Sequence, residues 1–137
     1  MKKINIIFAF LAIFLAQGCE DLINSLSEKT ELEIRASGVC VSDQNTYKID
    51  NSYPNEVTVS FNGFSNAEGT HYRPKVIIYC GGSELKTYSG DEAINGHHDD
   101  TYSASSTDVE IYAELCQDPD PVYEDTCRIK LTNISVY

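Results

Sequence analysis

The stretch VEIYAEL, residues 109–115, decides the fold class because its apolar and polar side chains alternate strictly. Val109, Ile111, Ala113 and Leu115 fall on one side of an extended chain, and the intervening glutamates and tyrosine fall on the other side. This period of two residues is typical of a β-strand with one buried face. The stretch therefore predicts a strand whose apolar side lines a core.

The same alternation recurs along most of residues 31–137. Further apolar faces are expected at Leu32, Ile34 and Ala36, at Val57, Val59 and Phe61, and at Cys127, Ile129 and Leu131. Residues 76–79 form a continuous apolar run, which is expected of a central strand covered on both faces. After Leu131 the apolar positions shift to Ile134 and Val136, which predicts a β-bulge near Asn133.

The number of strands favours an all-β fold. About seven antiparallel strands, with no helical periodicity between them, predict a small two-sheet β-sandwich of immunoglobulin-like architecture. A small barrel is the alternative. The chain contains no Trp, so the buried Trp of antibody-type domains is missing and only the architecture is expected to match. We expect residues 31–137 to form this single domain.

Residues 89–106 form the longest stretch without a strand pattern, and we predict a polar loop of 18 residues there. The loop contains His97, His98, Asp99 and Asp100, the densest group of metal-ligating residue types in the chain. Neighbouring side chains diverge on an extended chain, so they seldom share one metal ion. We therefore expect no metal site.

Four cysteines of the domain, Cys40, Cys80, Cys116 and Cys127, are expected to form two disulfides. Four cysteines allow three connectivities, and the sequence alone does not choose among them. The last two strands look like a hairpin around the turn at residues 118–121, so we rank a Cys116–Cys127 bond first. That bond leaves Cys40 to pair with Cys80.

The first 18 residues have the features of a secretory signal peptide. Two lysines precede an almost wholly apolar run, residues 6–16, which is shorter than the about 20 residues needed to span a bilayer. The run ends in LAQGC, residues 15–19, which resembles the lipobox of bacterial lipoproteins. The resemblance implies cleavage before Cys19 and attachment of acyl chains to that cysteine.

A second kind of cleavage fits the same residues. Ala16, Gln17 and Gly18 also satisfy the small-x-small rule of ordinary signal peptidase, which would leave Cys19 as the N-terminus of a soluble protein. The cysteine count favours lipidation, because exported proteins rarely carry an unpaired exposed thiol and lipidation of Cys19 leaves an even number.

The residues after Cys19 bear on the location in the envelope. Many Gram-negative lipoproteins of the inner membrane have Asp directly after the cysteine, where this chain has Glu20. Glu20 and Asp21 are similar to the short acidic stretches of surface-exposed lipoproteins in Bacteroidota. These resemblances imply a lipid-anchored protein of the outer membrane, facing the periplasm or the cell surface. Residues 19–30 would then be the lipidated N-terminus and tether.

Charge and missing motifs exclude several functions. The formal net charge is −11, and removal of the leader, which has two lysines and no acid, takes it to about −13, a surface that repels nucleic acid. The chain has no GxSxG elbow, HExxH zinc motif, phosphate loop or dinucleotide fingerprint. We therefore expect no enzyme and no cofactor.

The nine tyrosines suggest a binding role. Tyr53, Tyr72, Tyr102 and Tyr123 are expected on exposed loops, where tyrosine supplies rigid contact area for proteins and a ring that stacks on sugars. The expected function is a lipid-anchored envelope protein with a non-catalytic binding role toward a protein or a glycan. The alternatives are an accessory or structural lipoprotein of an outer-membrane assembly and an inhibitor of a basic secreted enzyme.

Overall fold

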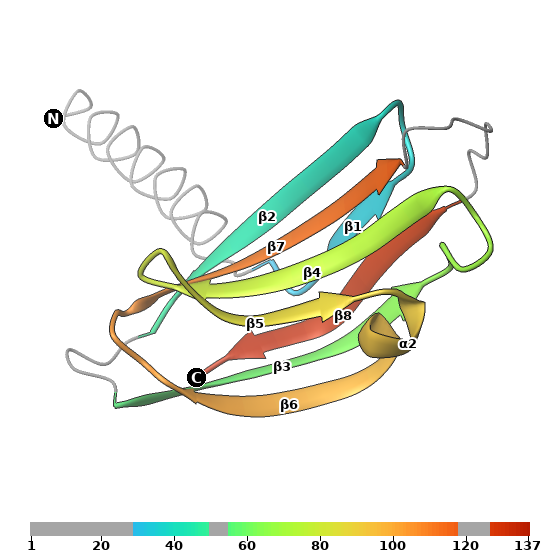
Figure 1. Ribbon diagram of the computed structural model, residues 1–137. Helices are drawn as coiled ribbons and strands as arrows, with labels where there is room; N and C mark the ends of the chain where they lie inside the picture. Colours follow the sequence, from blue (N-terminus) through green and yellow to red (C-terminus); the bar gives the residue numbers. More distant parts are fainter. Residues whose placement is uncertain (1–28, 50–54, 118–126) are drawn as a thin grey trace, which may run out of the picture.

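A computed structural model of the chain describes residues 29–49, 55–117 and 127–137, which form eight β-strands and one short helix (Figure 1). The elements in chain order are β1 (Leu32–Arg35), β2 (Cys40–Lys48), β3 (Glu56–Ser65), β4 (Tyr72–Cys80), β5 (Ser83–Ser89), α2 (Asp91–Ile94), β6 (Gly96–Ser103), β7 (Asp108–Gln117) and β8 (Arg128–Val136). Among these described elements there is no helix with the length and hydropathy to cross a membrane.

The strands form two four-stranded antiparallel sheets packed as a sandwich. Sheet A has the order β1-β8-β3-β6, and sheet B has the order β2-β7-β4-β5. This confirms the predicted all-β sandwich, with one strand more than the expected seven. The bulge predicted near Asn133 is also confirmed: the register of β3 with β8 shifts there, and Asn133 has a φ of 51°.

The strand connections are nested around the β4–β5 hairpin. β3 pairs with β6, β2 pairs with β7 and β1 pairs with β8, so each outer pair encloses the inner ones along the chain. Eight strands connected in this way form a jelly roll. Immunoglobulin-type domains instead place their first two strands side by side in one sheet. The likeness to them extends only to the two-sheet architecture.

The predicted hairpin of the last two strands is wrong. β7 pairs with β2 and β4 in sheet B, whereas β8 pairs with β1 and β3 in sheet A. Each strand has one apolar face, and the two faces meet the core from opposite sheets. The turn predicted at residues 118–121 lies outside the described residues.

The predicted long loop at residues 89–106 is also wrong, because it contains α2 and β6. β6 is an edge strand that pairs only with β3, and its side chains are polar on both faces. Exposure therefore alternates along β6, but hydropathy does not. This is why the strand is not visible in the sequence.

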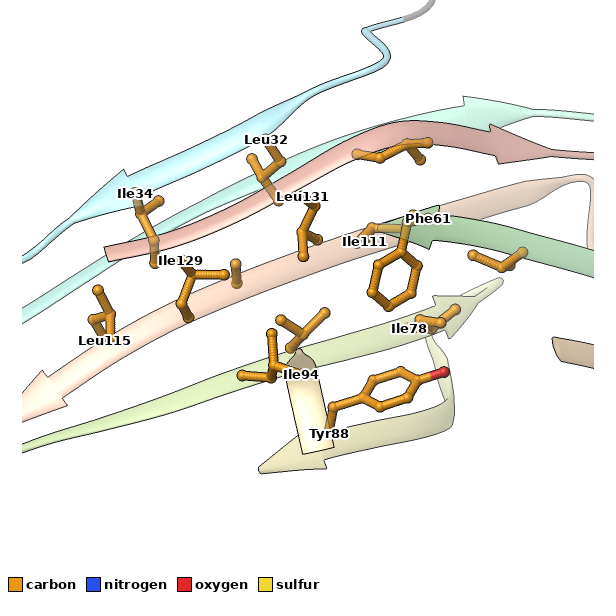
Figure 2. Close-up of a cluster of buried hydrophobic side chains, with 14 of the residues drawn as sticks. Leu32, Ile34, Phe61, Ile78, Tyr88, Ile94, Ile111, Leu115, Ile129 and Leu131 are labelled. Atoms are coloured by element: carbon orange, nitrogen blue, oxygen red, sulfur yellow. The ribbon is translucent and has the colours of Figure 1, made fainter. Parts of the chain in front are cut away.

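The core lies between the two sheets. Figure 2 shows side chains of both sheets pointing into it, among them Ile78, Ile111 and Leu115 from sheet B and Phe61, Ile129 and Leu131 from sheet A. Alternation predicts five of these positions, and Ile78 belongs to the predicted continuous apolar run. Each of the six is at most 1% exposed. Full burial of one such side chain stabilises the fold by about 1.5–3 kcal/mol.

The cysteine pairing differs from the prediction. Cys40 and Cys116 are direct partners in the β2–β7 register and form a disulfide, with their Cα atoms 4.1 Å apart. Cys80 and Cys127 are buried and free. The Sγ of Cys80 lies 3.4 Å from the carbonyl oxygen of Ser106. The predicted bonds, Cys116 with Cys127 and Cys40 with Cys80, are wrong, and one disulfide forms where two were expected.

The reason is the direction in which each cysteine points. Cys116 follows Leu115 and therefore points outward from sheet B, as does Cys40, whereas Cys80 and Cys127 point into the core. Cys127 lies beside Thr70, just before β4, and Cys80 ends that strand. Nine extended residues span about 26 Å at about 3.3 Å per residue, so the two free thiols lie too far apart to bond.

The sandwich has two ends that differ. One end, which we name the disulfide end, carries the Cys40–Cys116 bond, the β3–β4 loop and α2 (Figure 1). At the other end the chain enters the domain: the Tyr47 hydroxyl donates a hydrogen bond to the carbonyl of Lys29 at 2.6 Å. Because Tyr47 lies near the far end of β2 from Cys40, we name this the Lys29 end.

Candidate functional site

A cleft of about 680 Å³ lies at the disulfide end, over the outer face of sheet B. Its volume is within the range of about 300–1,000 Å³ that is usual for ligand sites. The cleft is lined by residues 67–70, 72–75 and 89–92 together with Glu114 and Cys116. It therefore combines a sheet floor with walls from the β3–β4 loop and the start of α2.

An ion pair forms part of the floor. Lys75 and Glu114 are cross-strand partners of β4 and β7, and the Lys75 Nζ lies 2.6 Å from the Glu114 Oε1. The hydroxyl of Tyr112 donates to the Glu114 Oε2 at 3.0 Å. The floor therefore presents an ammonium and a carboxylate, and the neighbouring phenol of Tyr112 hydrogen-bonds to that carboxylate.

Hydrogen bonding fixes the charge state of this pair. The bond with Glu114 raises the pKa of Lys75 above its ordinary value, and the bond with Lys75 lowers the pKa of Glu114. Both groups are charged at neutral pH. An ionised Glu114 is suited to accepting hydrogen bonds and poorly suited to donating a proton as a general acid.

The wall formed by the β3–β4 loop is held by a buried carboxylate. Asp91, which is 9% exposed, accepts hydrogen bonds from the Ser65 hydroxyl, from the Ala67 amide at 3.0 Å and from the Glu68 amide at 2.6 Å. The side chain of Asn95 adds two bonds to the backbone of Ser65, at 2.5 and 3.1 Å. The loop is thus fixed to α2 from within.

Tyr72 lies on β4 and is 3% exposed, so its expected place on an exposed loop is wrong. Its hydroxyl donates to the carbonyl of Gly38 at 3.0 Å and accepts from the Gln117 Nε2 at 2.8 Å. The residue lines the cleft while tying the β1–β2 connection to the end of β7. Its polar atom is therefore occupied within the protein.

Tyr102 also lies on a strand, β6, and is half-buried instead of exposed on a loop. Its hydroxyl lies 3.2 Å from that of Tyr88, which donates to Asp100 at 2.9 Å. Burial raises the pKa of both phenols above the ordinary value of 10.0. Tyr102 closes the margin between β5 and β6. Tyr53, Tyr123 and Cys19 lie outside the described residues.

The histidines and aspartates of residues 97–100 are divided by the alternation of β6. His97 and Asp99 are exposed on sheet A, whereas His98 packs on the Tyr88 ring with centroids 4.7 Å apart. His98 also contacts the carbonyl of Ile94 at 2.9 Å through its Nε2. Within the described ranges, no three His, Cys, Asp or Glu side chains come together in a way that could hold a metal ion.

The sequence did not single out the floor of the cleft. Tyr112 and Glu114 occupy the polar side of the fold-deciding stretch, so their outward direction follows from it. That Glu114 meets Lys75, 39 residues away in the chain, depends on a strand register that no local pattern encodes. The apolar run at residues 76–79 is a further signal for this surface, because it places Ile77 and Tyr79 on the outer face of sheet B.

A second hollow of about 420 Å³ lies at the other end of this face. It is lined by Thr46, Tyr79, Gly81, Gly82, Asp108 and Glu110. Both hollows therefore open on the outer side of sheet B, one at the disulfide end and one at the Lys29 end.

No protein-family model matches the chain, and no curated protein matches it.

Proposed function

We propose that this protein is a lipid-anchored lipoprotein of the outer membrane that binds a protein or a glycan without catalysing a reaction. The cleft is the binding site. The observation that carries the proposal is a cleft with internally fixed walls and a charged floor, at the end of the domain opposite the point where the chain enters.

The positions of the two ends favour a ligand-facing cleft. Lys29, the first described residue, lies at one end, and Cys116 in the cleft lies at the other. β2 connects these ends and spans about 26 Å at about 3.3 Å per residue. The chain that leads from Cys19 therefore joins the described domain at the end away from the cleft.

Anchoring is tested by a Cys19→Ala variant. The expected result is release of the protein into the soluble fraction, because the acyl chains have no other attachment point in this proposal. A wild-type control and a Cys80→Ala variant, in which a buried thiol is changed, should stay with the membrane. Retention of Cys19→Ala in the membrane would contradict the proposal.

Binding in the cleft is tested by photo-cross-linking in cells. A photoreactive amino acid at Glu92, an exposed residue of the cleft wall, is compared with one at Asp99, an exposed residue of sheet A. The expected result is a discrete adduct from position 92 and none from position 99. Adducts from neither position, or equal adducts from both, would count against the cleft as the site.

A further inference from the structure

The two hollows are joined by the outer face of sheet B. Tyr112 and Ile77 lie between them, and Tyr79 lines the second hollow. All three point outward from the neighbouring strands β7 and β4. The β7 residues that line the two hollows run from Cys116 to Asp108, a distance of about 26 Å at about 3.3 Å per residue. We name this surface the sheet B track.

We propose that the sheet B track binds an extended, uncharged glycan chain, with the cleft at one end and the second hollow at the other. This rests on the proposed function and specifies its ligand.

Tyr112 is a partly exposed aromatic side chain of the sheet B track. Tyr112 and Glu114 point to the same side of β7, and the hydrogen bond between them lays the Tyr112 side chain along the strand. Ile77, the cross-strand partner of Tyr112, also points outward yet is only 8% exposed, since side chains of the same face lie over it. A ring lying along a sheet offers its face to the apolar side of a sugar ring.

Hydrogen-bonding side chains surround the two tyrosine rings of the track. Lys75 supplies N–H donors, and Glu114 and Glu110 supply carboxylate acceptors beside Tyr112 and Tyr79. Sugar hydroxyls both donate and accept hydrogen bonds, so paired donors and acceptors serve them well. The Lys75–Glu114 contact also cancels the charge of the two groups locally, which suits a neutral ligand.

The charge of the track favours a neutral glycan over an acidic one. The full chain carries a net charge of −11, and Glu68, Glu92, Glu110 and Asp108 line the two hollows. These acids outnumber the cations Arg73 and Lys75 of the cleft, so the net field repels uronate and sulfate groups. An uncharged glycan avoids this repulsion.

A protein partner is disfavoured by the same face. Protein interfaces are centred on exposed aromatic or aliphatic anchors. The large apolar side chains that are exposed in the described part of the chain are Val39, Phe64 and Tyr137, and none belongs to a strand of sheet B. The partly exposed tyrosines of the track suit stacking better than insertion into a protein pocket.

The test uses the full-length protein in mild detergent on a glycan array. The neutral probes are mannan, xyloglucan, mixed-linkage β-glucan and amylopectin, and the acidic probes are polygalacturonate and chondroitin sulfate. We expect binding to at least one neutral glycan and none to the acidic ones. Affinity for oligosaccharides of that glycan should rise with length and level off at about 26 Å, the length of the track.

Variants localise the binding. Tyr112→Ala should weaken it about tenfold, the scale of one lost stacking contact. The matched control Tyr137→Ala changes an exposed tyrosine directly after β8 and should leave affinity within twofold. Tyr79→Ala tests the second half of the track, and unchanged thermal unfolding of each variant confirms that it is folded.

Binding to none of the neutral probes, binding to acidic glycans alone, or equal losses in Tyr112→Ala and Tyr137→Ala would overturn the glycan proposal. A protein adduct from position 92 together with a negative array would leave the cleft as a binding site and reject the glycan track. Absence of both would reject the cleft as well. The two proposals therefore fail separately.

Discussion

The two outer faces of the sandwich each carry a lysine paired with glutamate across neighbouring strands. On sheet B, Lys75 and Glu114 approach to 2.6 Å, whereas on sheet A the Nζ of Lys130 lies 3.9 Å from Glu33. The residue types and the cross-strand placement are alike, and the surroundings differ. On sheet B, Asp91 fixes the β3–β4 loop and α2 beside the ion pair. These two elements form the walls of the cleft over the sheet face.

Sheet B is also the sheet that carries the disulfide, and removal of this bond should have the largest effect of the changes considered. Cys40 and Cys116 are 76 residues apart, so a Cys40→Ala/Cys116→Ala double variant should lose about 4 kcal/mol of unfolding free energy. Urea denaturation measures this loss. A loss below about 1 kcal/mol would show that the register of β2 with β7 needs no covalent support.

The wall that distinguishes the two faces depends on Asp91. Asp91→Ala leaves the amides of Ala67 and Glu68 and the Ser65 hydroxyl without their acceptor, and should cost about 3 kcal/mol. Hydrogen exchange at residues 66–69 should quicken at the same time. The matched control Asp99→Ala, on exposed sheet A, should change stability by less than about 0.5 kcal/mol. Equal effects would contradict the role of Asp91.

The two lysine–glutamate pairs can be compared directly by double-mutant cycles. The pair of Lys75 with Glu114 should show a coupling of about 0.5 kcal/mol, because Lys75 is 41% exposed and water screens the contact. The pair of Lys130 with Glu33 should show a smaller coupling, since its atoms are 3.9 Å apart. A larger coupling on sheet A would show that the distance between the charged atoms does not set the strength of these pairs.

The pH dependence of the sheet B coupling follows from the pKa shifts. The pKa of Glu114 is lowered from 4.5, so its contribution is present above that pH and is lost as the pH falls through the lowered value. The pKa of Lys75 is raised from 10.5, so its contribution is present below that pH and is lost as the pH rises through the raised value. The coupling should therefore be constant from about pH 5 to 10. Cycles repeated at pH 3, 7 and 11 measure this.

Much of the fold follows from alternation in the sequence. The strand at residues 109–115 and the partners of its buried face were predictable because burial on one side selects apolar residues at every second position. β6 was not predictable, because its inward residues Asp100 and Tyr102 each hydrogen-bond to the Tyr88 hydroxyl and need no apolar character.

The sequence contains a signal against the predicted pairing of the cysteines, namely the side of the strand on which each one lies. Alternation places Leu115 inward and hence Cys116 outward, and the same pattern places Cys127 inward with Ile129. In the predicted hairpin, two cysteines on opposite faces could not meet, so the direction of each side chain rejects the Cys116–Cys127 bond. The choice of Cys40 as the partner still needs the β2–β7 register, which is a property of the whole fold.

The site was less predictable than the fold. The direction of Tyr112 and Glu114 follows from their own strand, but the arrival of Lys75 beside them and the closure of the wall by Asp91 join distant segments. Tyr72 and Tyr102 could not be told from surface tyrosines, because a phenol occupied by Gly38 or Tyr88 looks the same in sequence as one that faces water.

The nesting of the strand pairs bears on how the chain reaches this structure. The β4–β5 hairpin has the shortest loop to close, and once it forms, the ends of β3 and β6 are brought near each other; β2 with β7 and β1 with β8 follow in the same way. Each pairing shortens the effective loop that the next one must close, which lowers its entropic cost. We therefore expect the domain to zip outward from residues 81–82, with the Cys40–Cys116 bond recording the arrival of the third pair.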